Sequence, residues 1–243
     1  NVHITDEICT LSIDSSGNSL HKRGYRLETN EAPISEALAA GLILLSGWDK
    51  KSHFVDGMCG SGTFLVEAAM IGANIPANIN REHFAFQDWP DYDEALWKLI
   101  RSSQLKRAQD CYGRVIGYDL NPDTVASAKL NIANSGLEDY IEIHCENFFE
   151  TKKPEGPTHL VFNPPYGVRI QGDIPEIYKS IGDTLKKNYS GAEAWFLTSH
   201  MDGLKYVGLR ASRKIEIYQA KLECRFVKYE MYQGSKKMKY KQV

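Results

Sequence analysis

The stretch FVDGMCGSGTF, residues 54–64, decides the fold of this 243-residue chain. A short apolar run ends in Asp56, a turn with glycines on both sides of Ser61 follows, and an apolar segment opens at Thr63. This order is typical of a β-strand, a tight loop and a helix. Gly60 and Gly62 leave the backbone bare, so we expect a ligand-binding loop at the carboxyl end of a buried strand.

Three familiar glycine motifs do not fit this loop. A P-loop requires Lys where Thr63 stands, and a dinucleotide fingerprint requires Gly where Leu65 stands. A hydrolase elbow has the pattern GxSxG, whereas Ser61 is flanked directly by glycines. What remains suits a ligand with an amino-acid moiety, since backbone amides can hold its carboxylate and Asp56 favours its ammonium. A turn used only for packing is the alternative.

Strand-like and helical segments alternate along most of the chain, which predicts an α/β fold with a doubly wound, mostly parallel sheet. The last segment, residues 214–232, contains two strand-like stretches without a helix between them. It therefore predicts an antiparallel pair at one edge and seven strands in all. We expect strands at 52–56, 114–119, 140–147, 158–163 and 193–199, and helices at 33–48, 62–72, 121–136 and 174–189.

The N-terminal part and one internal segment depart from this alternation. Residues 8–14 and 19–26 flank a turn-forming SSGN stretch and predict a hairpin. We expect residues 1–30 to form this hairpin and a linker, and residues 31–243 to form the main domain. Residues 79–113, which combine aromatic and helical character, predict an insertion together with a lengthened first helix of the sheet domain.

Composition narrows the class of protein. Hydrophobic residues make up 42% and charged residues 25%, and no apolar run is long enough to span a membrane. The net charge of −2 does not favour a free-standing nucleic-acid binder, although local basic patches matter more than the total. Five scattered cysteines indicate the reducing cytoplasm, and the histidines form no ligand cluster, so we expect no metal. Without an initiator Met or a signal peptide, we expect a fragment that lacks an upstream domain.

Polar side chains also end the next two strands. Asp119 follows the second strand, where an acid typically binds a ribose diol. An acid at a helix N-terminus is the alternative for Asp119, because Asn121 and Asp123 lie beside it. Asn147 ends the third strand, where its amide could bond the exocyclic amine of an adenine.

The stretch LVFNPPYGVR, residues 160–169, ends a buried strand in an amide, two prolines and an aromatic ring. Pro164 holds the preceding Asn163 in extended backbone, so its Oδ1 and the Pro164 carbonyl form two fixed acceptors. Such acceptors could bind both N–H groups of a base amine and direct its lone pair at a methyl donor. Tyr166 could stack on an extruded base. A proline-rich turn is the alternative.

Basic residues cluster in LHKRGYR, residues 20–26. Lys22, Arg23 and Arg26 predict either contact with RNA phosphates or a solvated hairpin edge. Arg169, just past Tyr166, is the better candidate for the RNA backbone.

Taken together, FVDGMCGSGTFLVEAA, GYDLNPDTVASAKLNIANSG and FNPPYGVR resemble an S-adenosylmethionine-dependent amino-methyltransferase with a Rossmann-like class I fold. With SLHKRGYR, APISEALAAGLILLSGW and KLECRFVKYEM, nearly the whole chain resembles the THUMP-linked rRNA guanine-N2 methyltransferases, often described as N6-adenine DNA methylases. The resemblance implies S-adenosylmethionine as cofactor, large-subunit rRNA as substrate and an upstream RNA-binding THUMP region. The resemblance implies that the methionine part of the cofactor is surrounded by Asp56, Cys59, Gly60, Ser61, Gly62 and Thr63. It also implies that the ribose lies at Asp119 and Leu120, and the adenine at Asn147 and Phe148. The target amine would lie at Asn163, Pro164, Pro165 and Tyr166.

Two residues depart from the pattern of that family. Gly57 stands where proline is common, which loosens the loop, and Asn147 stands where aspartate is common, which weakens adenine binding. A nucleophilic role for Cys59 would serve methylation at carbon, so a small residue packed against the cofactor is the better interpretation. Other activities compatible with the motifs are tRNA guanine-N2 methylation, adenine-N6 methylation of DNA, and non-catalytic cofactor and RNA binding.

Overall fold

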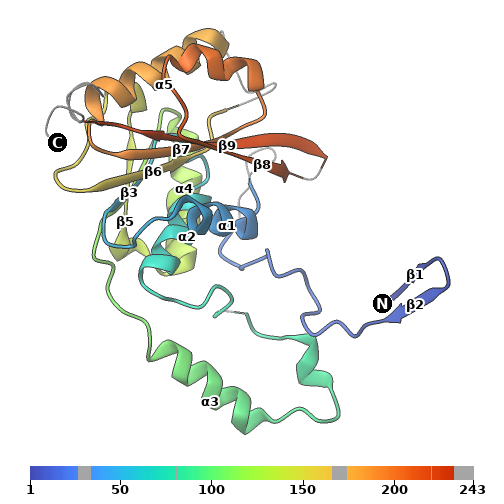
Figure 1. Cartoon of the computed structure of the whole chain (residues 1–243). Helices are drawn as coiled ribbons and strands as arrows, with labels where there is room; N and C mark the ends of the chain where they lie inside the picture. Colours follow the sequence, from blue (N-terminus) through green and yellow to red (C-terminus); the bar gives the residue numbers. More distant parts are fainter. Residues whose placement is uncertain (27–33, 80, 166–173, 220, 233–243) are drawn as a thin grey trace, which may run out of the picture.

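The computed structural model describes residues 1–26, 34–79, 81–165, 174–219 and 221–232. At its centre is a seven-stranded sheet of order β5-β4-β3-β6-β7-β9-β8 (Figure 1). Neighbouring strands from β5 to β7 pair in parallel, while β9 pairs antiparallel with β7 and β8. This confirms the predicted parallel sheet with an antiparallel edge pair. The strands are β3 (His53–Asp56), β4 (Val115–Asp119), β5 (Ile141–Cys145), β6 (Thr158–Phe162), β7 (Glu193–Thr198), β8 (Arg213–Gln219) and β9 (Leu222–Glu230).

Helices cover both faces of the sheet. Leu42 of α1, Leu65 of α2 and Ile132 of α4 share one hydrophobic cluster, whereas Ile181 of α5 belongs to the other. Parallel strands between two helical layers are buried on both faces, so their carboxyl ends are the edge left for a ligand. The helices are α1 (Glu36–Ser46), α2 (Thr63–Gly72), α4 (Pro122–Ser135) and α5 (Ile174–Asn188).

The N-terminal hairpin lies earlier in the chain than the sequence suggests. Its strands are β1 (Val2–Thr5) and β2 (Ile8–Leu11), joined at Asp6, which has a φ of 52°. Residues 19–26, predicted as the second strand, are not a strand in the structure. The prediction was wrong here because it placed the turn at the glycine of SSGN, whereas Asp6 provides the left-handed backbone.

The insertion forms its own helix rather than extending α2. Helix α2 ends at Gly72, because Asn74 adopts a φ of 54° and Pro76 follows. Helix α3 (Glu94–Leu105) then begins separately, capped by the side chain of Asp93. The predicted lengthened helix is therefore wrong. Short 3-10 helices complete the fold: η1 (Ala85–Asp88), η2 (Glu138–Tyr140), η3 (Phe148–Glu150) and η5 (Met201–Val207).

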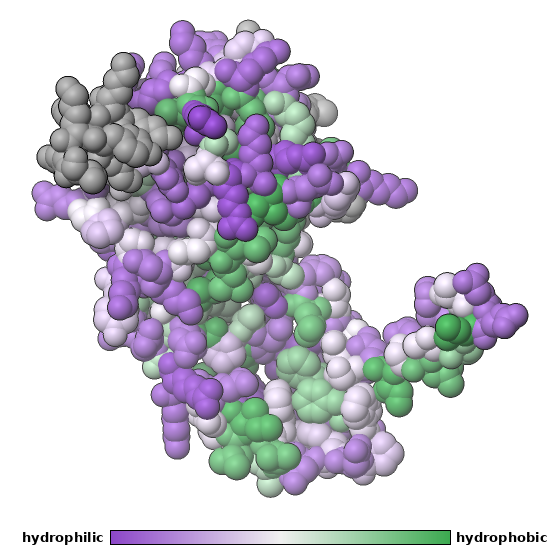
Figure 2. Space-filling model, viewed as in Figure 1, coloured by the Kyte–Doolittle hydropathy of each residue, from purple (hydrophilic) through white to green (hydrophobic). Residues whose placement is uncertain are grey.

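The hairpin and α3 lie away from the sheet (Figure 1). The insertion contacts the N-terminal segment through Arg81, whose Nη2 donates to the carbonyl oxygens of Ser16 at 2.8 Å and Asn18 at 2.7 Å. Exposed apolar side chains gather on these two parts, among them Leu11 and Leu99 (Figure 2). Within the described residues, no helix has the length and apolar character that a membrane crossing requires.

Candidate functional site

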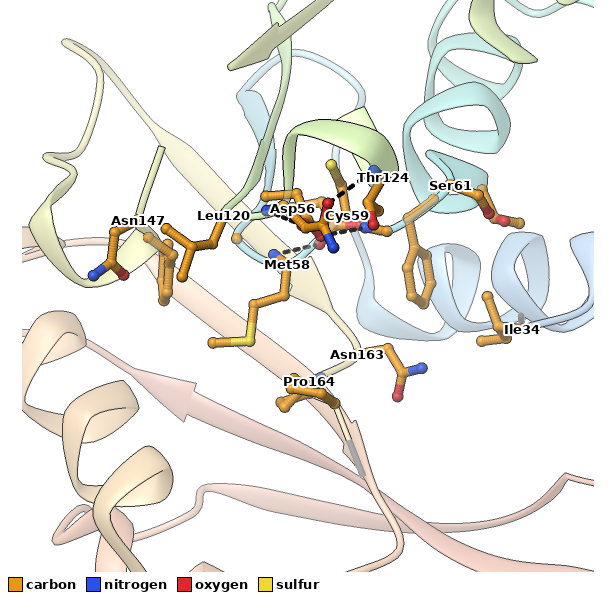
Figure 3. A pocket seen from close by; sticks show the side chains of 18 of the residues that line it. Ile34, Asp56, Met58, Cys59, Ser61, Leu120, Thr124, Asn147, Asn163 and Pro164 are labelled. Carbon is orange, nitrogen blue, oxygen red and sulfur yellow. Dashed lines mark hydrogen bonds between the residues drawn. The ribbon is translucent and has the colours of Figure 1, made fainter. Parts of the chain in front are cut away.

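A cavity of about 900 Å³ opens at the carboxyl ends of β3, β4, β5 and β6 (Figure 3). Most residues expected in the site line this one cavity. They are Asp56, Cys59, Gly60, Ser61, Thr63, Asp119, Leu120, Asn147, Phe148, Asn163, Pro164 and Pro165. Gly62 caps α2 beside the cavity, while Tyr166 and Arg169 lie outside the described residues.

The glycine loop is fixed by hydrogen bonds from its backbone to neighbouring elements. The Cys59 N–H donates to the Tyr118 carbonyl at 2.9 Å, and the Asn131 side chain on α4 donates to the Ser61 carbonyl at 3.1 Å. Gly62 has a φ of 82°, and a Cβ there would lie 3.4 Å from the Cβ of Ala128. Glycine is therefore favoured by the left-handed backbone, while a Cβ at this position would only touch Ala128 of α4 at van der Waals distance.

Asp56 and Cys59 are buried at the base of this loop. Asp56 is only 1% exposed, and its Oδ1 accepts from the Met58 N–H at 3.1 Å. Burial raises the pKa of the Asp56 carboxyl well above its usual value. Burial, with Asp56 and Asp119 nearby, likewise raises the pKa of the Cys59 thiol. A thiol that stays protonated is a poor nucleophile, which agrees with a packing role for Cys59.

Asp119 holds the two loops of the cavity together. Its Oδ2 accepts from the Gly60 N–H at 3.0 Å, and its Oδ1 accepts from the Asn121 N–H at 3.0 Å. The capping of α4 falls to Asn121, whose Oδ1 accepts from the Asp123 N–H at 2.9 Å. The carboxylate of Asp119 is thus fixed at the cavity wall, with Leu120 exposed beside it.

Asn147 bonds within its own turn. Its Oδ1 accepts from the Phe149 N–H at 3.1 Å, and its Nδ2 donates to Glu150 at 3.2 Å. The side chain therefore caps η3, so its amide is already engaged at the position where the sequence suggested a contact with adenine. The neighbouring Phe148 is 3% exposed and packs against Phe162 and other rings.

Gly57 has a packing reason of its own. A Cβ at this position would lie 2.6 Å from the Phe148 ring, a distance that side chains do not tolerate. Phe148 thus occupies the space that a larger residue at position 57 would need. The close approach of the Phe148 ring thus explains why glycine stands at position 57 in this chain.

Asn163 lies just past the end of β6, followed by Pro164, which is buried, and Pro165. Its Oδ1 is buried and has no hydrogen-bond partner among the described residues. A buried acceptor without a partner costs about 1–3 kcal/mol, so its persistence in a cavity wall indicates a donor supplied by a ligand. Figure 3 shows Asn163 and Pro164 lying across the cavity from Asp56.

The basic segment differs from both of its sequence interpretations. Lys22 is exposed, but Arg23 pairs with Glu67 at 3.3 Å and keeps only 9% of its side chain exposed. Arg26 pairs with Glu36 at 3.7 Å and is 11% exposed. These two arginines attach the N-terminal segment to α1 and α2, so within the described residues they contribute to packing rather than to an exposed basic surface.

Several residues that line the cavity were not singled out from the sequence. They include Thr124 in the first turn of α4, Ile177 in the first turn of α5, and Ile34 just before α1. Asn131 supports the glycine loop from α4 without lining the cavity, and it does carry a sequence signal, because a polar residue at an inward-facing helical position needs a buried partner.

Comparison with known proteins identifies the family. A family model for the RMKL-like methyltransferase domain matches residues 23–228. The chain belongs to this family. The match begins at Arg23, which pairs with Glu67 of α2.

Relatives of this RMKL-like domain are longer proteins. The Synechocystis protein named "Putative RNA methyltransferase slr0064" is 35% identical over 96% of this chain and 61% of its own length. The "Ribosomal RNA large subunit methyltransferase K/L" of Shewanella sp. W3-18-1 is 34% identical over 96% of this chain and 34% of its own length. The chain therefore spans about a third to three fifths of these relatives.

Solved structures agree with the fold of the RMKL-like domain. "SMU.472, a putative methyltransferase complexed with SAH" has a TM-score of 0.84 and 36% identity, over 91% of this chain and 58% of that one. A Listeria monocytogenes protein, described as a "predicted N6-adenine-specific DNA methylase", has a TM-score of 0.85 and 33% identity, over 96% and 60% of the two chains. The Rossmann-like class I fold implied by the sequence is thereby confirmed.

Proposed function

We propose that this domain transfers a methyl group from S-adenosylmethionine to the exocyclic N2 amine of a guanine in large-subunit rRNA. The observation that carries this proposal is the buried Oδ1 of Asn163, which has no partner in the part of the chain that the structure describes and lies in the wall of a cavity whose opposite wall is the glycine loop. Membership of a methyltransferase family and the SAH complex of SMU.472 support the choice of cofactor.

The cavity fits this cofactor. Its volume of about 900 Å³ lies within the range of small-molecule sites. No atom of the described residues lies within 4 Å of a Cβ placed on Gly60, which has a φ of 53°, so the loop exposes its backbone to open space. When bound, S-adenosylmethionine would supply an electrophilic methyl on its sulfonium. Asp56, Cys59 and Thr63 would surround its methionine part, Asp119 and Leu120 its ribose, and Phe148 its adenine.

Asn163 would act on the target amine through geometry rather than as a base. Its Oδ1 and the Pro164 carbonyl are two acceptors next to each other, and a base amine carries two N–H donors. Accepting both would favour a pyramidal nitrogen with its lone pair directed into the cavity. We further propose that the Tyr166 ring stacks on the extruded base and that Lys22 and Arg169 contact phosphates.

The names of the relatives support RNA as the substrate. The Shewanella relatives are named for the large ribosomal subunit, and the Synechocystis relative is named for RNA. The Listeria relative is named instead for adenine N6 of DNA, which is also an exocyclic amine with two N–H groups. The acceptors at Asn163 suit either amine, so recognition of the nucleic acid would depend on contacts outside the cavity.

Nucleoside mass spectrometry tests the substrate directly. The purified chain is incubated with S-adenosylmethionine and, separately, with a large-subunit rRNA transcript, bulk tRNA and duplex DNA. We expect N2-methylguanosine in the rRNA, and its absence when Asn163 is replaced by Ala. N2-methylguanosine in tRNA alone, or N6-methyladenine in DNA alone, would contradict the proposed substrate.

We also propose that an upstream RNA-binding region in the longer protein supplies most of the affinity for rRNA. The net charge of −2, together with the engagement of Arg23 and Arg26, leaves few phosphate contacts on this chain. A protein that includes such a region should show a lower KM for rRNA at a similar kcat. Equal KM values for the longer protein and this chain would contradict the proposal.

A further inference from the structure

Arg26 lies against one end of the cavity. Its Nη2 donates to the Thr63 Oγ1 at 2.7 Å and to the Ile34 carbonyl at 3.0 Å. Both acceptors belong to residues that line the cavity. The guanidinium of Arg26 is therefore held directly behind two residues of the wall, next to the first residue of α2.

The described residues do not use every donor of the Arg26 guanidinium. Both of its hydrogen bonds to described residues come from Nη2, and its buried Nε has no hydrogen-bond partner among the described residues. Glu36 lies 3.7 Å from Nε, which is an ion-pair distance but too long for a hydrogen bond. Arg23 differs, because its Nε bonds Glu67 at 3.3 Å and its Nη1 donates to the Leu20 carbonyl at 2.8 Å. Within the described residues, Arg26 therefore keeps a donor for a further anionic acceptor, whereas the Nε of Arg23 is already bonded.

The position of Arg26 indicates which end of the proposed cofactor would lie near it. Figure 3 shows Ile34 and Ser61 at the end of the cavity opposite Asn147. With the adenine at the Asn147 end, the amino-acid end of the cofactor would lie where Arg26 is held. The N-terminus of α2 begins at the same end, capped by Gly62 without a side-chain bond, and it favours negative charge.

We propose that Arg26 binds the carboxylate of the cofactor's methionine end and does not serve as an RNA contact. This inference rests on the proposed function, because it assumes that the cavity holds S-adenosylmethionine. Glu36 keeps the guanidinium at the wall, Thr63 and Ile34 fix its orientation, and the ligand carboxylate accepts from the remaining donors. Arginine suits this role because its planar fork matches a carboxylate.

Calorimetry with two ligands tests the proposal. S-adenosylhomocysteine carries the amino-acid end, and 5′-methylthioadenosine keeps the adenosine and the sulfur but lacks that end. We expect Arg26→Ala to weaken binding of S-adenosylhomocysteine by about 10- to 100-fold, the range of a charge-assisted bond. Binding of 5′-methylthioadenosine should change less than twofold. The matched control is Arg23→Ala, which removes a similarly buried arginine and should affect both ligands to the same degree.

Other outcomes would overturn the proposal. An equal loss for both ligands in Arg26→Ala would show a purely structural role, and an unchanged affinity for S-adenosylhomocysteine would show no role. Should Arg26→Ala fail to fold, Arg26→Lys keeps the cation, and it should still lose affinity for S-adenosylhomocysteine more than for 5′-methylthioadenosine. If the unaltered chain binds 5′-methylthioadenosine as tightly as S-adenosylhomocysteine, the carboxylate subsite fails while the cofactor site stands. Binding of neither ligand would instead reject the proposed function.

Discussion

The two walls of the cavity differ in whether their polar side-chain atoms have hydrogen-bond partners. On the wall formed by β3 and β4, the carboxylate oxygens of Asp119 both accept backbone N–H groups, and Asp56 accepts from Met58. On the wall formed by β6, the Asn163 Oδ1 is buried without a partner among the described residues. The first wall is shaped by the chain's own hydrogen bonds, whereas the second holds an acceptor that no described residue satisfies.

We propose that this difference separates a cofactor-binding surface from a reacting one. Polar groups that are already bonded keep a ligand in place without having to rearrange, which favours affinity. A buried acceptor without a partner lowers the stability of the free protein, and this cost is offset only when a ligand supplies the matching donor. We therefore expect changes on the first wall to alter cofactor affinity and changes on the second to alter turnover.

The largest effect should come from Asn163. Replacing it with Ala removes the acceptor, so we expect methyl transfer to fall about a hundredfold or more, as for the loss of one preorganised polar group. The affinity for S-adenosylhomocysteine should stay within a few-fold, because no bond on the β3–β4 wall is touched. Steady-state kinetics and calorimetry measure the two quantities on the same preparations.

The stability of the Asn163 variants provides the control. Because Oδ1 has no partner to lose among the described residues, Asn163→Ala should not lower the midpoint of thermal unfolding. Asn163→Asp, which keeps an acceptor oxygen, should retain more activity than the Ala variant. A large loss of cofactor affinity in Asn163→Ala would show that the two walls are not independent.

The other end of β6 provides a pH test of the same strand. His159 is buried, contacts Ser46 at 2.8 Å, and lies 3.8 Å from Glu193. Burial lowers its pKa from 6.5 to about 4, although Glu193 opposes the shift. The unfolded chain therefore binds a proton at a higher pH than the folded one, so stability is lost as pH falls from 6.5 toward 4. This loss amounts to about 3 kcal/mol at 1.36 kcal/mol per pKa unit.

Urea unfolding at several pH values measures this loss. His159→Gln removes the titrating group and should flatten the pH dependence between 6.5 and 4, apart from the contribution of carboxylates. An unchanged slope in the variant would mean that other groups govern acid stability. Because His159 lies far along β6 from Asn163, cofactor affinity should be the same in both proteins at neutral pH.

A smaller effect is expected at Asp119, on the binding wall. Asp119→Ala frees the Gly60 and Asn121 N–H groups and removes the acid proposed to bind the ribose, so cofactor binding should weaken by about 1–3 kcal/mol. Asp119→Asn keeps one acceptor oxygen and should lose less. Calorimetry with S-adenosylhomocysteine checks both variants. A fall in kcat without a fall in affinity would contradict the division between the walls.

The sheet and the cavity could be predicted because their signals are local. Alternating apolar strands and helices fix the order of elements, and the carboxyl ends of parallel strands meet at one edge. Asp56, Asp119 and Asn163 therefore come together once the fold is known. The glycine loop and the residue before Pro164 add backbone constraints that can be recognised from short stretches.

The remainder depends on partners far along the chain. The sequence of Arg23 and Arg26 looks like an exposed basic patch, and only the fold brings Glu67 and Glu36 to them. The bond between Asn147 and Phe149 and the contact between Gly57 and Phe148 depend equally on the folded loops. The position of the hairpin and the end of α2 depend instead on Asp6 and Asn74, which adopt left-handed backbone although neither is glycine.

The smallest effect should come from Tyr25, where the N-terminal segment meets α2. Its hydroxyl donates to the Glu67 Oε1 at 3.2 Å, in a buried position beside Arg23. Tyr25→Phe removes this hydrogen bond while Arg23 still satisfies Glu67, so the free energy of unfolding should fall by about 1 kcal/mol. Affinity for S-adenosylhomocysteine should not change, because neither Tyr25 nor Glu67 lines the cavity. Urea unfolding and calorimetry decide the matter, and a variant that is equally stable but binds the ligand more weakly would show that this network, and not only Arg26, controls the binding wall.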